Sequence, residues 1–263
     1  MCRLLGYLGK TIELDKLLYK PEHSLVVQSY QPREMREAIL NADGFGVGWY
    51  HQQKETLPYI YKNILPIWSD INLPQISRYV ESGCVLSYVR SATPGLSVDL
   101  SNCQPFSSDR LLFIHNGFIH KFRTTLYRPI RSSLNDYTYQ LIQGTTDSEH
   151  IFALIINELQ TSAIDNLETA LANALSKLTQ LAKSSKVYFL ANVIISNGKQ
   201  LVASRYSNRP PSPTLYYLQN DLTYPEGLII ASEPLFDGNW KSCPEKSIIS
   251  VGEDLEVHIS PVS

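Results

Sequence analysis

The sequence has few cysteines and no arrangement of them that would cross-link a fold or bind a metal. Four cysteines are spread over 263 residues, at positions 2, 84, 103 and 243. None belongs to a CxxC pair or to another metal-ligand spacing, and four thiols in a chain of this length do not make a disulfide framework. The sequence therefore predicts four separate thiols, with neither a metal ion nor another cofactor.

A strong charge of either sign and a long apolar run are also missing. The formal net charge is -2 and no basic run is present, which argues against a nucleic-acid partner and against binding to a membrane surface. No apolar stretch approaches the ~18 residues that cross a bilayer, and the N-terminus has no signal-peptide pattern. We therefore expect a soluble, cytoplasmic protein with neither a membrane nor a nucleic acid as partner.

What the chain does contain is enough apolar material for one large core, since 43% of its residues are hydrophobic. Strand-like runs rich in β-branched and aromatic residues cover 2–8, 45–50, 84–90, 110–114, 187–196, 200–205, 215–218 and 227–232, with two more near Ile248 and Val257. Two helical patterns lie between them, at 151–159 behind the capping-box spacing of Thr146 and Glu149, and at 167–181. Because strands and helices do not alternate, we predict a single α+β domain over residues 1–263.

Cys2 is the residue that points most directly to chemistry. Removal of Met1 would leave an α-amine and a thiol on the same residue. Both groups titrate close to neutral pH, near ~8 and ~8.5. An N-terminal nucleophile that uses its own amine as the base is a known variant of the nucleophile-and-base pair. The alternative is that Cys2 is a small buried apolar residue like most free cysteines.

Other polar residues stand where predicted strands or helices end or begin. Arg90 and Thr93 follow one strand, Asn116 and Gly117 follow another, and Asp147 opens a helix. Asn-Gly is also an ordinary turn dipeptide, and an arginine and an aspartate can form a surface ion pair of little energetic weight.

Two further residues leave alternatives open. His115 can orient a backbone group or act on protons. Trp68 can belong to the core or to a pocket for the acceptor or leaving group.

Six short motifs, taken in order, resemble one known family. They are Met-Cys-Arg-Leu-Leu-Gly-Tyr at 1–7, Ala-Asp-Gly-Phe-Gly-Val-Gly-Trp-Tyr at 42–50, Val-Arg-Ser-Ala-Thr at 89–93, Asn-Cys-Gln-Pro-Phe at 102–106, His-Asn-Gly at 115–117 and Thr-Asp-Ser-Glu at 146–149. The sequence is similar to the class II glutamine amidotransferase domain, an N-terminal-nucleophile hydrolase. Within that group it resembles the stand-alone hydrolases of ergothioneine biosynthesis and glutathione degradation. The resemblance implies a four-layer αββα sandwich of two antiparallel sheets, with the catalytic motifs within about residues 1–160.

The resemblance also implies roles at the reacting centre. Cys2 would be the nucleophile and its α-amine the base. The side-chain amide of Asn116 and the backbone N–H of Gly117 would stabilise the oxyanion.

At the other end of a glutamyl substrate, the resemblance implies three binding residues. Arg90 offers a planar fork that matches an α-carboxylate, and Asp147 can accept from an α-ammonium group. Thr93 would bind the substrate beside them. One departure from the family is Gln104, which stands where relatives carry histidine.

Three functions are compatible with these residues. The first is hydrolysis of a small γ-glutamyl compound, for example an ergothioneine precursor, through a thioester on Cys2. The second is a glutaminase subunit that supplies ammonia to a separate synthase, because 263 residues leave no room for an attached one. The third is a non-catalytic γ-glutamyl-binding protein.

Overall fold

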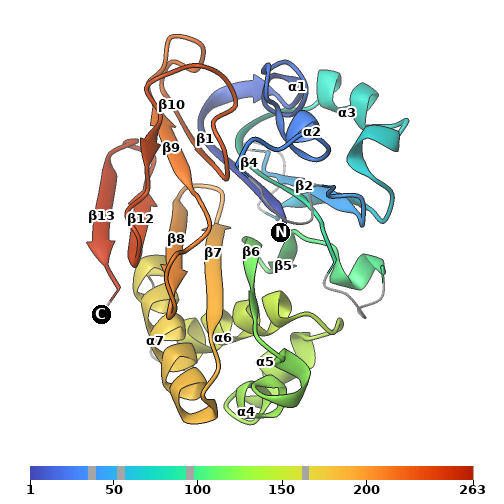
Figure 1. Cartoon of the computed structure of the whole chain (residues 1–263). Coiled ribbons are helices and arrows are strands. Elements are labelled where there is room, and N and C mark those ends of the chain that lie inside the picture. Colours follow the sequence, from blue (N-terminus) through green and yellow to red (C-terminus); the bar gives the residue numbers. More distant parts are fainter. Residues whose placement is uncertain (35–39, 52–56, 93–97, 162–165, 263) are drawn as a thin grey trace.

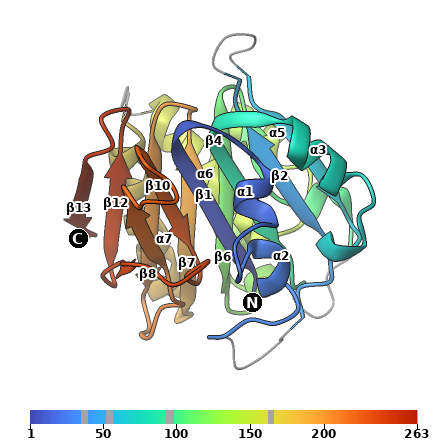
Figure 2. The same ribbon diagram turned by 90° about the horizontal axis from the view of Figure 1, so that it is seen from above.

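Two antiparallel sheets stack face to face in the computed structural model, with helices on their outer faces (Figure 1, Figure 2). The structure describes residues 1–34, 40–51, 57–92, 98–161 and 166–262. The α+β class and the sandwich of two antiparallel sheets that the sequence predicts are confirmed.

The first sheet has seven strands in the order β11-β9-β10-β1-β4-β2-β3, so the N-terminal strand β1 lies at its centre. Its strands are β1 (Arg3–Glu13), β2 (Phe45–Trp49), β3 (Tyr59–Asn63), β4 (Glu81–Val89), β9 (Tyr216–Gln219), β10 (Gly227–Ala231) and β11 (Lys241–Ser242). A central strand is hydrogen-bonded on both edges, and β1 pairs with β4 on one side and with β10 on the other. This pairing fixes the start of the chain in a rigid part of the fold.

The second sheet has six strands in the order β13-β12-β8-β7-β6-β5. They are β5 (Phe106–Ser108), β6 (Leu111–Ile119), β7 (Phe189–Ser196), β8 (Leu201–Ser207), β12 (Ser247–Val251) and β13 (Val257–Pro261). Strand β6 pairs with β7 over residues 112–119, but with β5 only over residues 111–113. The rest of that edge of β6 is therefore open to other partners.

Short helices cover the first sheet and longer ones cover the second (Figure 1). The helices are α1 (Asp15–Leu18), α2 (Leu25–Gln28), α3 (Leu73–Tyr79), α4 (Tyr127–Arg131), α5 (Asp136–Leu141), α6 (Asp147–Thr161) and α7 (Leu167–Ser185), with 3-10 turns η1 (Ile67–Ser69), η2 (Leu100–Asn102) and η3 (Phe122–Thr124). The two predicted helical segments are α6 and α7.

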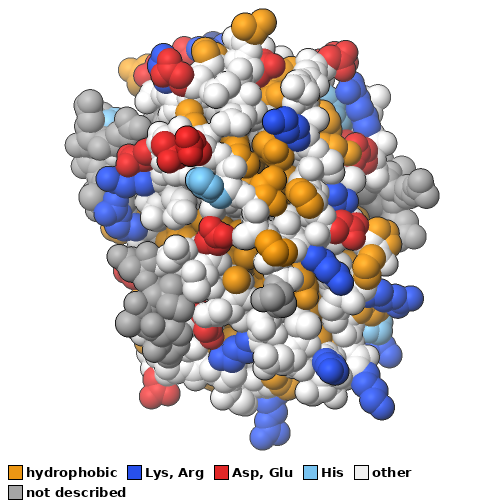
Figure 3. Space-filling model, turned by 90° about the vertical axis from the view of Figure 1, so that its left-hand side faces the viewer, with side chains coloured by type: hydrophobic (Ala, Val, Ile, Leu, Met, Phe, Trp, Pro, Cys, Tyr) orange, Lys and Arg blue, Asp and Glu red, His pale blue; other side chains and the backbone are white. Residues whose placement is uncertain are grey.

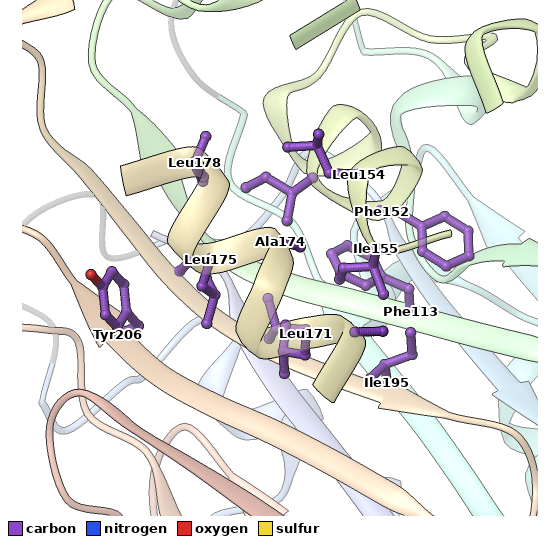
Figure 4. Packing of buried hydrophobic residues seen from close by; sticks show 14 of the residues in the cluster. Phe113, Phe152, Leu154, Ile155, Leu171, Ala174, Leu175, Leu178, Ile195 and Tyr206 are labelled. Atoms are coloured by element: carbon purple, nitrogen blue, oxygen red, sulfur yellow. The ribbon is translucent and has the colours of Figure 1, made fainter. Parts of the chain in front are cut away.

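The stripe of α7 that the sequence predicts is its buried face. Leu171, Leu175 and Leu178 pack with Phe113 and Ile195 of the second sheet (Figure 4). Burying one leucine side chain stabilises the fold by about 2 kcal/mol. This helix supports the sheet that carries β6.

Side chains of β1 alternate between two cores, as the period of two in a strand requires. Leu5 and Tyr7 point into the core under α1, α2 and α3. Leu4 and Leu8 point into the core between the two sheets, and Cys2 packs at the edge of that core. The nucleophile candidate therefore lies on the face that turns toward the second sheet.

Strand β6 shows the same alternation, and it is longer than the sequence predicts. Phe113 and Ile119 face the helices α6 and α7, whereas Leu112 and Ile114 face the first sheet. Asn116 continues the second series. The expectation that the strand ends before the Asn-Gly pair is wrong, because pairing with β7 overrides the local turn preference of these two residues.

The start of α6 is only partly as predicted. The backbone N–H of Glu149 donates to Thr146 Oγ1 at 3.3 Å, which is one half of a capping box. The Glu149 carboxylate does not return to the Thr146 backbone. It accepts instead from the N–H groups of Gln143 (2.9 Å) and Gly144 (2.7 Å), and so holds the loop before the helix.

The surface carries charges of both signs. On the face shown in Figure 3, acidic and basic side chains are interspersed around a group of hydrophobic ones. In the described part of the chain, no helix combines the length and the apolar character needed to cross a membrane.

Acidification is expected to destabilise the fold through His150 of α6. Its Nδ1 lies 2.7 Å from the Thr146 carbonyl oxygen, and its Nε2 accepts from Arg131 Nε at 3.0 Å. Burial lowers the pKa of His150 to about 4 from an ordinary 6.5. Between these values the unfolded chain binds a proton that the folded chain does not, so stability is lost as the pH falls below ~6.5.

Going from pH 7 to pH 5 should lower the free energy of unfolding by about 2 kcal/mol through this residue. Urea unfolding at both pH values measures the change. The variant His150→Gln should show a smaller pH dependence than the wild type, whereas His258→Gln, at an exposed position, should not. Equal pH dependence in all three proteins would contradict the assignment.

Candidate active site

The sulfur of Cys2 is held between two strand ends of the first sheet. It lies 2.9 Å from the hydroxyl of Tyr88 on β4. It also accepts from the backbone N–H of Ser91 at 3.4 Å, and its own S–H can donate to the Ser91 carbonyl at 3.6 Å. The Tyr88 hydroxyl group and both backbone groups of Ser91 thus surround this sulfur.

The peptide bond before Cys2 is held as well. With its amide turned so that the nitrogen faces acceptors, Asn41 donates to the Met1 carbonyl at 3.1 Å and to the Val89 carbonyl at 3.2 Å. Met1 is 39% exposed. Its removal would leave the new amine at the surface end of β1, next to the Cys2 sulfur.

The backbone of Cys2 is fixed by a buried ion pair. Arg3 Nη1 donates to the Cys2 carbonyl at 3.0 Å, and Arg3 Nη2 pairs with Glu233 Oε1 at 2.8 Å. His23 Nε2 lies 2.8 Å from the other carboxylate oxygen of Glu233. Glu233, two residues after the end of β10, therefore anchors the start of the chain.

Glu233 remains charged although it is fully buried. Burial alone would raise the pKa of its carboxyl group, but the hydrogen bond with His23 and the charge of Arg3 outweigh this and lower the pKa. The backbone N–H groups of Arg33 (2.8 Å) and Glu34 (3.2 Å) also donate to the carboxylate. A buried carboxylate with this many donors is a rigid support.

Arg90 lies beside Cys2 and is buried. Its side chain is 2% exposed and follows Tyr88 on the same face of β4. Nη1 donates to the Asp43 carbonyl at 3.2 Å. The alternative of a surface ion pair with Asp147 is therefore wrong. Thr93, the other residue predicted here, lies outside the described residues.

Asn116 is the clearest sign of an unfilled site. It is 1% exposed, and neither its Nδ2 nor its Oδ1 has a hydrogen-bond partner among the described residues. A buried amide without partners costs about 1–3 kcal/mol per group. Such a cost is typical of a site that awaits a ligand.

Gly117 exposes its N–H on the open edge of β6. The backbone N–H of His120 donates to the Tyr188 carbonyl at 2.9 Å, in the register of the β6–β7 pairing. The N–H groups of the even-numbered residues of β6 therefore point toward β7. The N–H groups of odd residues point the other way, where Ile119 N donates to Asp147 Oδ2 at 2.7 Å. The N–H of Gly117 lies on that edge, which β5 leaves unpaired beyond Phe113.

Position 117 also requires glycine because there is no room for a side chain. A Cβ atom there would lie 1.9 Å from the Leu190 carbonyl oxygen and 2.5 Å from His115 Nε2. The backbone of β6 can therefore approach β7 and His115 this closely only without a Cβ atom.

Asp147 and His115 complete the arrangement around β6. Asp147 Oδ1 accepts from Ser148 N at 2.8 Å, while its other oxygen accepts from Ile119. His115 Nε2 lies 3.1 Å from the Leu190 carbonyl, which can only accept, so Nε2 carries the proton. Nδ1 then accepts from Ser148 Oγ at 2.8 Å.

Burial lowers the pKa of His115, although the nearby Asp147 opposes this. A neutral ring with both nitrogens bonded fits a role in orienting the backbone, the first of the two alternatives considered.

The side-chain amide of Gln104 bonds to the backbone of β6 in the place of a neighbouring strand. Its amide oxygen accepts from His115 N, and its amide nitrogen donates to His115 O at 3.2 Å. The side chain thus imitates a peptide group at the point where β5 has ended. Its role is to hold the edge of β6 beside Gly117.

Three other residues are clearly placed. Trp68 is 40% exposed, with its ring edge-on to Tyr30 at 5.7 Å between centroids, so it is not a core residue. Cys84 and Cys103 are buried free thiols, which agrees with the prediction of separate thiols. Among the described residues, no group of three or more histidine, cysteine, aspartate or glutamate side chains could hold a metal ion.

The structure thus gathers the predicted residues into two groups. Cys2 and Arg90 lie at one end of the first sheet, whereas Asn116, Gly117 and Asp147 lie along β6. Cys2 and Asn116 are on sheet faces that turn toward the same core, and β1 and β4 both contact β6.

Sequence reasoning assigned no role to four residues that support the site. Tyr88 had a local signal, because it stands two positions before Arg90 and must share its face of the strand. Arg3 and Gln104 lie within motifs, although nothing local showed their partners. Glu233 had no signal at all, since it meets Arg3 only through the fold.

Comparison with known proteins agrees with this geometry. The family model described as "Glutamine amidotransferases class-II" matches residues 1–226. The chain belongs to the class-II glutamine amidotransferases. As a member of that family it is an enzyme, an amidohydrolase.

Two relatives of this amidotransferase are informative. The probable glutamine amidotransferase DUG3 of Saccharomyces cerevisiae is 31% identical, over 95% of this chain and 82% of its own. The gamma-glutamyl-hercynylcysteine sulfoxide hydrolase of Mycolicibacterium smegmatis is 29% identical over the full length of both chains.

Among solved structures, a protein of Silicibacter pomeroyi described as a "glutamine aminotransferase class-II domain protein" is similar, with a TM-score of 0.73 and 25% identity over 99% of both chains. An allosteric regulatory enzyme of purine biosynthesis shares the fold alone, with a TM-score of 0.68 and 15% identity over 99% of this chain and 49% of its own.

Proposed function

We propose that this amidotransferase hydrolyses the γ-glutamyl amide bond of a small compound through a thioester on Cys2 and releases glutamate. The observation that carries the proposal is the buried amide of Asn116, which has no partner among the described residues and continues the face of β6 that turns toward the sheet of Cys2. A nucleophile and an unused donor on facing sheets are what attack on an amide carbonyl requires. The hydrolase name of the M. smegmatis relative supports the same bond as the target.

In the proposed reaction, the free α-amine of Cys2 takes the thiol proton and the sulfur attacks the γ-carbonyl carbon. Asn116 Nδ2 and the N–H of Gly117 donate to the oxygen as its charge develops. The C–N bond breaks, and the leaving amine takes the proton from the α-ammonium group. Water then attacks the thioester, and glutamate leaves as the thiol is restored.

The glutamyl group would be recognised at its zwitterionic end. The Arg90 guanidinium offers two parallel donors to an α-carboxylate. Each Asp147 oxygen already accepts one backbone N–H and has a lone pair left for an α-ammonium group. Thr93 stays a predicted neighbour of these two residues. Together they would select a glutamyl group over a simple amide.

A second candidate is a glutaminase subunit that passes ammonia to a separate synthase. The name of the yeast relative, a probable glutamine amidotransferase, favours this alternative. Free glutamine would then be the preferred substrate, and activity would rise when the synthase is added.

A panel assay separates these functions. Protein whose Met1 removal is verified by intact mass is incubated with glutamine, glutathione and γ-glutamyl-hercynylcysteine sulfoxide, and products are followed by mass spectrometry. We expect free glutamate from at least one γ-glutamyl compound at a kcat/KM at least about tenfold above that for glutamine, a difference of ~1.4 kcal/mol. A preference for glutamine would favour the glutaminase subunit, and binding without turnover would favour the non-catalytic protein.

Two broader expectations also stay predictions. We propose that residues 1–263 act as a single catalytic domain, which the full-length match to the M. smegmatis relative supports. The cytoplasmic location rests on the sequence alone.

A further inference from the structure

We propose that Tyr88 is a catalytic residue whose hydroxyl group donates to the Cys2 sulfur and stabilises the thiolate that departs when the thioester is hydrolysed. The inference rests on the proposed function, because it concerns a step of that reaction.

The position of Tyr88 leaves its hydroxyl group one partner. The residue pairs with Leu4 of β1 in the first sheet, and its ring packs in the core between the sheets. Its Oη lies 2.9 Å from Cys2 Sγ. No other hydrogen bond joins this hydroxyl group to a described residue. The hydroxyl group of a buried tyrosine usually finds a hydrogen-bond partner, and here that partner is the reacting sulfur.

The direction of the hydrogen bond follows from the protonation of the two groups. Burial raises the pKa of the Tyr88 phenol well above its ordinary value, and the neighbouring Cys2 charge raises it further. The phenol therefore keeps its proton throughout the working pH range. A thiolate can only accept, so in that state the O–H of Tyr88 donates to the sulfur.

A second donor to the Cys2 sulfur comes from the backbone just after the end of β4. The backbone N–H of Ser91 also points at the sulfur, at 3.4 Å, while the Ser91 carbonyl lies 3.6 Å away and can accept from the thiol. The site thus accommodates both the thiol and the thiolate. Two donors around one sulfur stabilise the charged form.

The step that depends most on Tyr88 is the second one. When water attacks the thioester, the C–S bond breaks and its electron pair goes to the sulfur. The hydrogen bond from the Tyr88 hydroxyl group to this sulfur becomes shorter as the sulfur gains charge. The proton stays on the Tyr88 oxygen. The proton from the attacking water goes to the Cys2 α-amine, which then returns it to the thiolate. No oxidant or further reactant is needed.

The variant Tyr88→Phe removes only the hydroxyl group and tests this step. Rapid mixing with a γ-glutamyl substrate, acid quenching and intact mass measurement give the rate constants for forming and for hydrolysing the glutamyl thioester. We expect the hydrolysis rate constant to fall about 10- to 100-fold, as for the loss of a hydrogen bond to a charged group. The thioester should then accumulate at steady state.

Tyr217→Phe is the matched control, because Tyr217 lies in the same core and its hydroxyl group bonds to no described residue. It should leave both rate constants unchanged. Thermal melting of both variants shows whether they fold, since a merely structural Tyr88 would change melting without shifting the balance of the two steps. An unchanged hydrolysis rate constant in Tyr88→Phe overturns the inference.

The outcome also separates this inference from the function on which it rests. If the wild type forms no glutamyl adduct on Cys2 with any γ-glutamyl compound, the proposed function fails. If the adduct forms and Tyr88→Phe hydrolyses it at the wild-type rate, only the role of Tyr88 fails.

Discussion

Replacement of Cys2 by alanine is expected to lower γ-glutamyl hydrolysis by about 10⁴-fold or more, because the reaction loses its nucleophile while the rest of the site stays intact. The side chain contacts Tyr88 and Ser91 at the edge of the core. Its loss should therefore change the melting temperature little. Mass spectrometry of glutamate release measures the activity, and a thermal melt measures the fold.

A second cysteine provides the control for this result. Cys84 is buried and its Sγ lies 3.1 Å from Ser196 Oγ. The variant Cys84→Ser keeps a hydrogen-bonding group there and should retain activity. Hydrolysis by pure Cys2→Ala protein at a rate near that of the wild type would show that the nucleophile lies elsewhere.

Replacement of Asn116 by leucine is expected to lower kcat by about 10²- to 10³-fold, the usual cost of one lost oxyanion donor. KM should change little, because the donor acts on charge that develops only in the transition state. Stability should stay equal or rise. The amide has no partner among the described residues, and a leucine of similar shape next to Ile114 would suit the core between the sheets.

Asn192, which pairs with Asn116 across the two strands, gives the contrasting case. Its Nδ2 donates to the carbonyls of Pro213 (3.0 Å) and Thr214 (3.1 Å). The variant Asn192→Leu should therefore lose about 1–3 kcal/mol of stability. Chemical unfolding and steady-state kinetics of the two variants distinguish the sites. If Asn116→Leu were as destabilised as Asn192→Leu and kept its kcat, Asn116 would be a structural residue.

The two asparagines illustrate a stability cost that accompanies function. Within the part of the chain that the structure describes, the Asn192 amide nitrogen has two acceptors and only its oxygen lacks a partner, whereas neither atom of the Asn116 amide has one. Proteins keep such groups mainly where a ligand completes them. The same reasoning separates two tyrosines of the core between the sheets. Among the described residues, the Tyr88 hydroxyl group bonds only to the reacting sulfur, whereas the Tyr50 hydroxyl group lies within hydrogen-bond distance of two backbone carbonyls.

Sequence patterns were reliable where the physics is local. The strand run behind Cys2 and the helical pattern of α7 depend on neighbours along the chain. Both elements are present, although β1 continues past the predicted end at residue 8 to Glu13. The Asn116-Gly117 pair misled for the same reason. Its turn preference is local and weak, and the pairing of β6 with β7 is stronger.

By itself, the sequence determined the family, the α+β class and a short set of polar residues around Cys2, because motifs and strand periods are properties of consecutive residues. Only the tertiary structure decided that Arg90 is buried and that the Asn116 amide has no hydrogen-bond partner among the described residues. It also decided that Tyr88 contacts the Cys2 sulfur and that Glu233 pairs with Arg3 behind the Cys2 backbone. These facts depend on contacts between distant parts of the chain. Burial and hydrogen bonding arise when two sheets stack, and no stretch of sequence contains both partners.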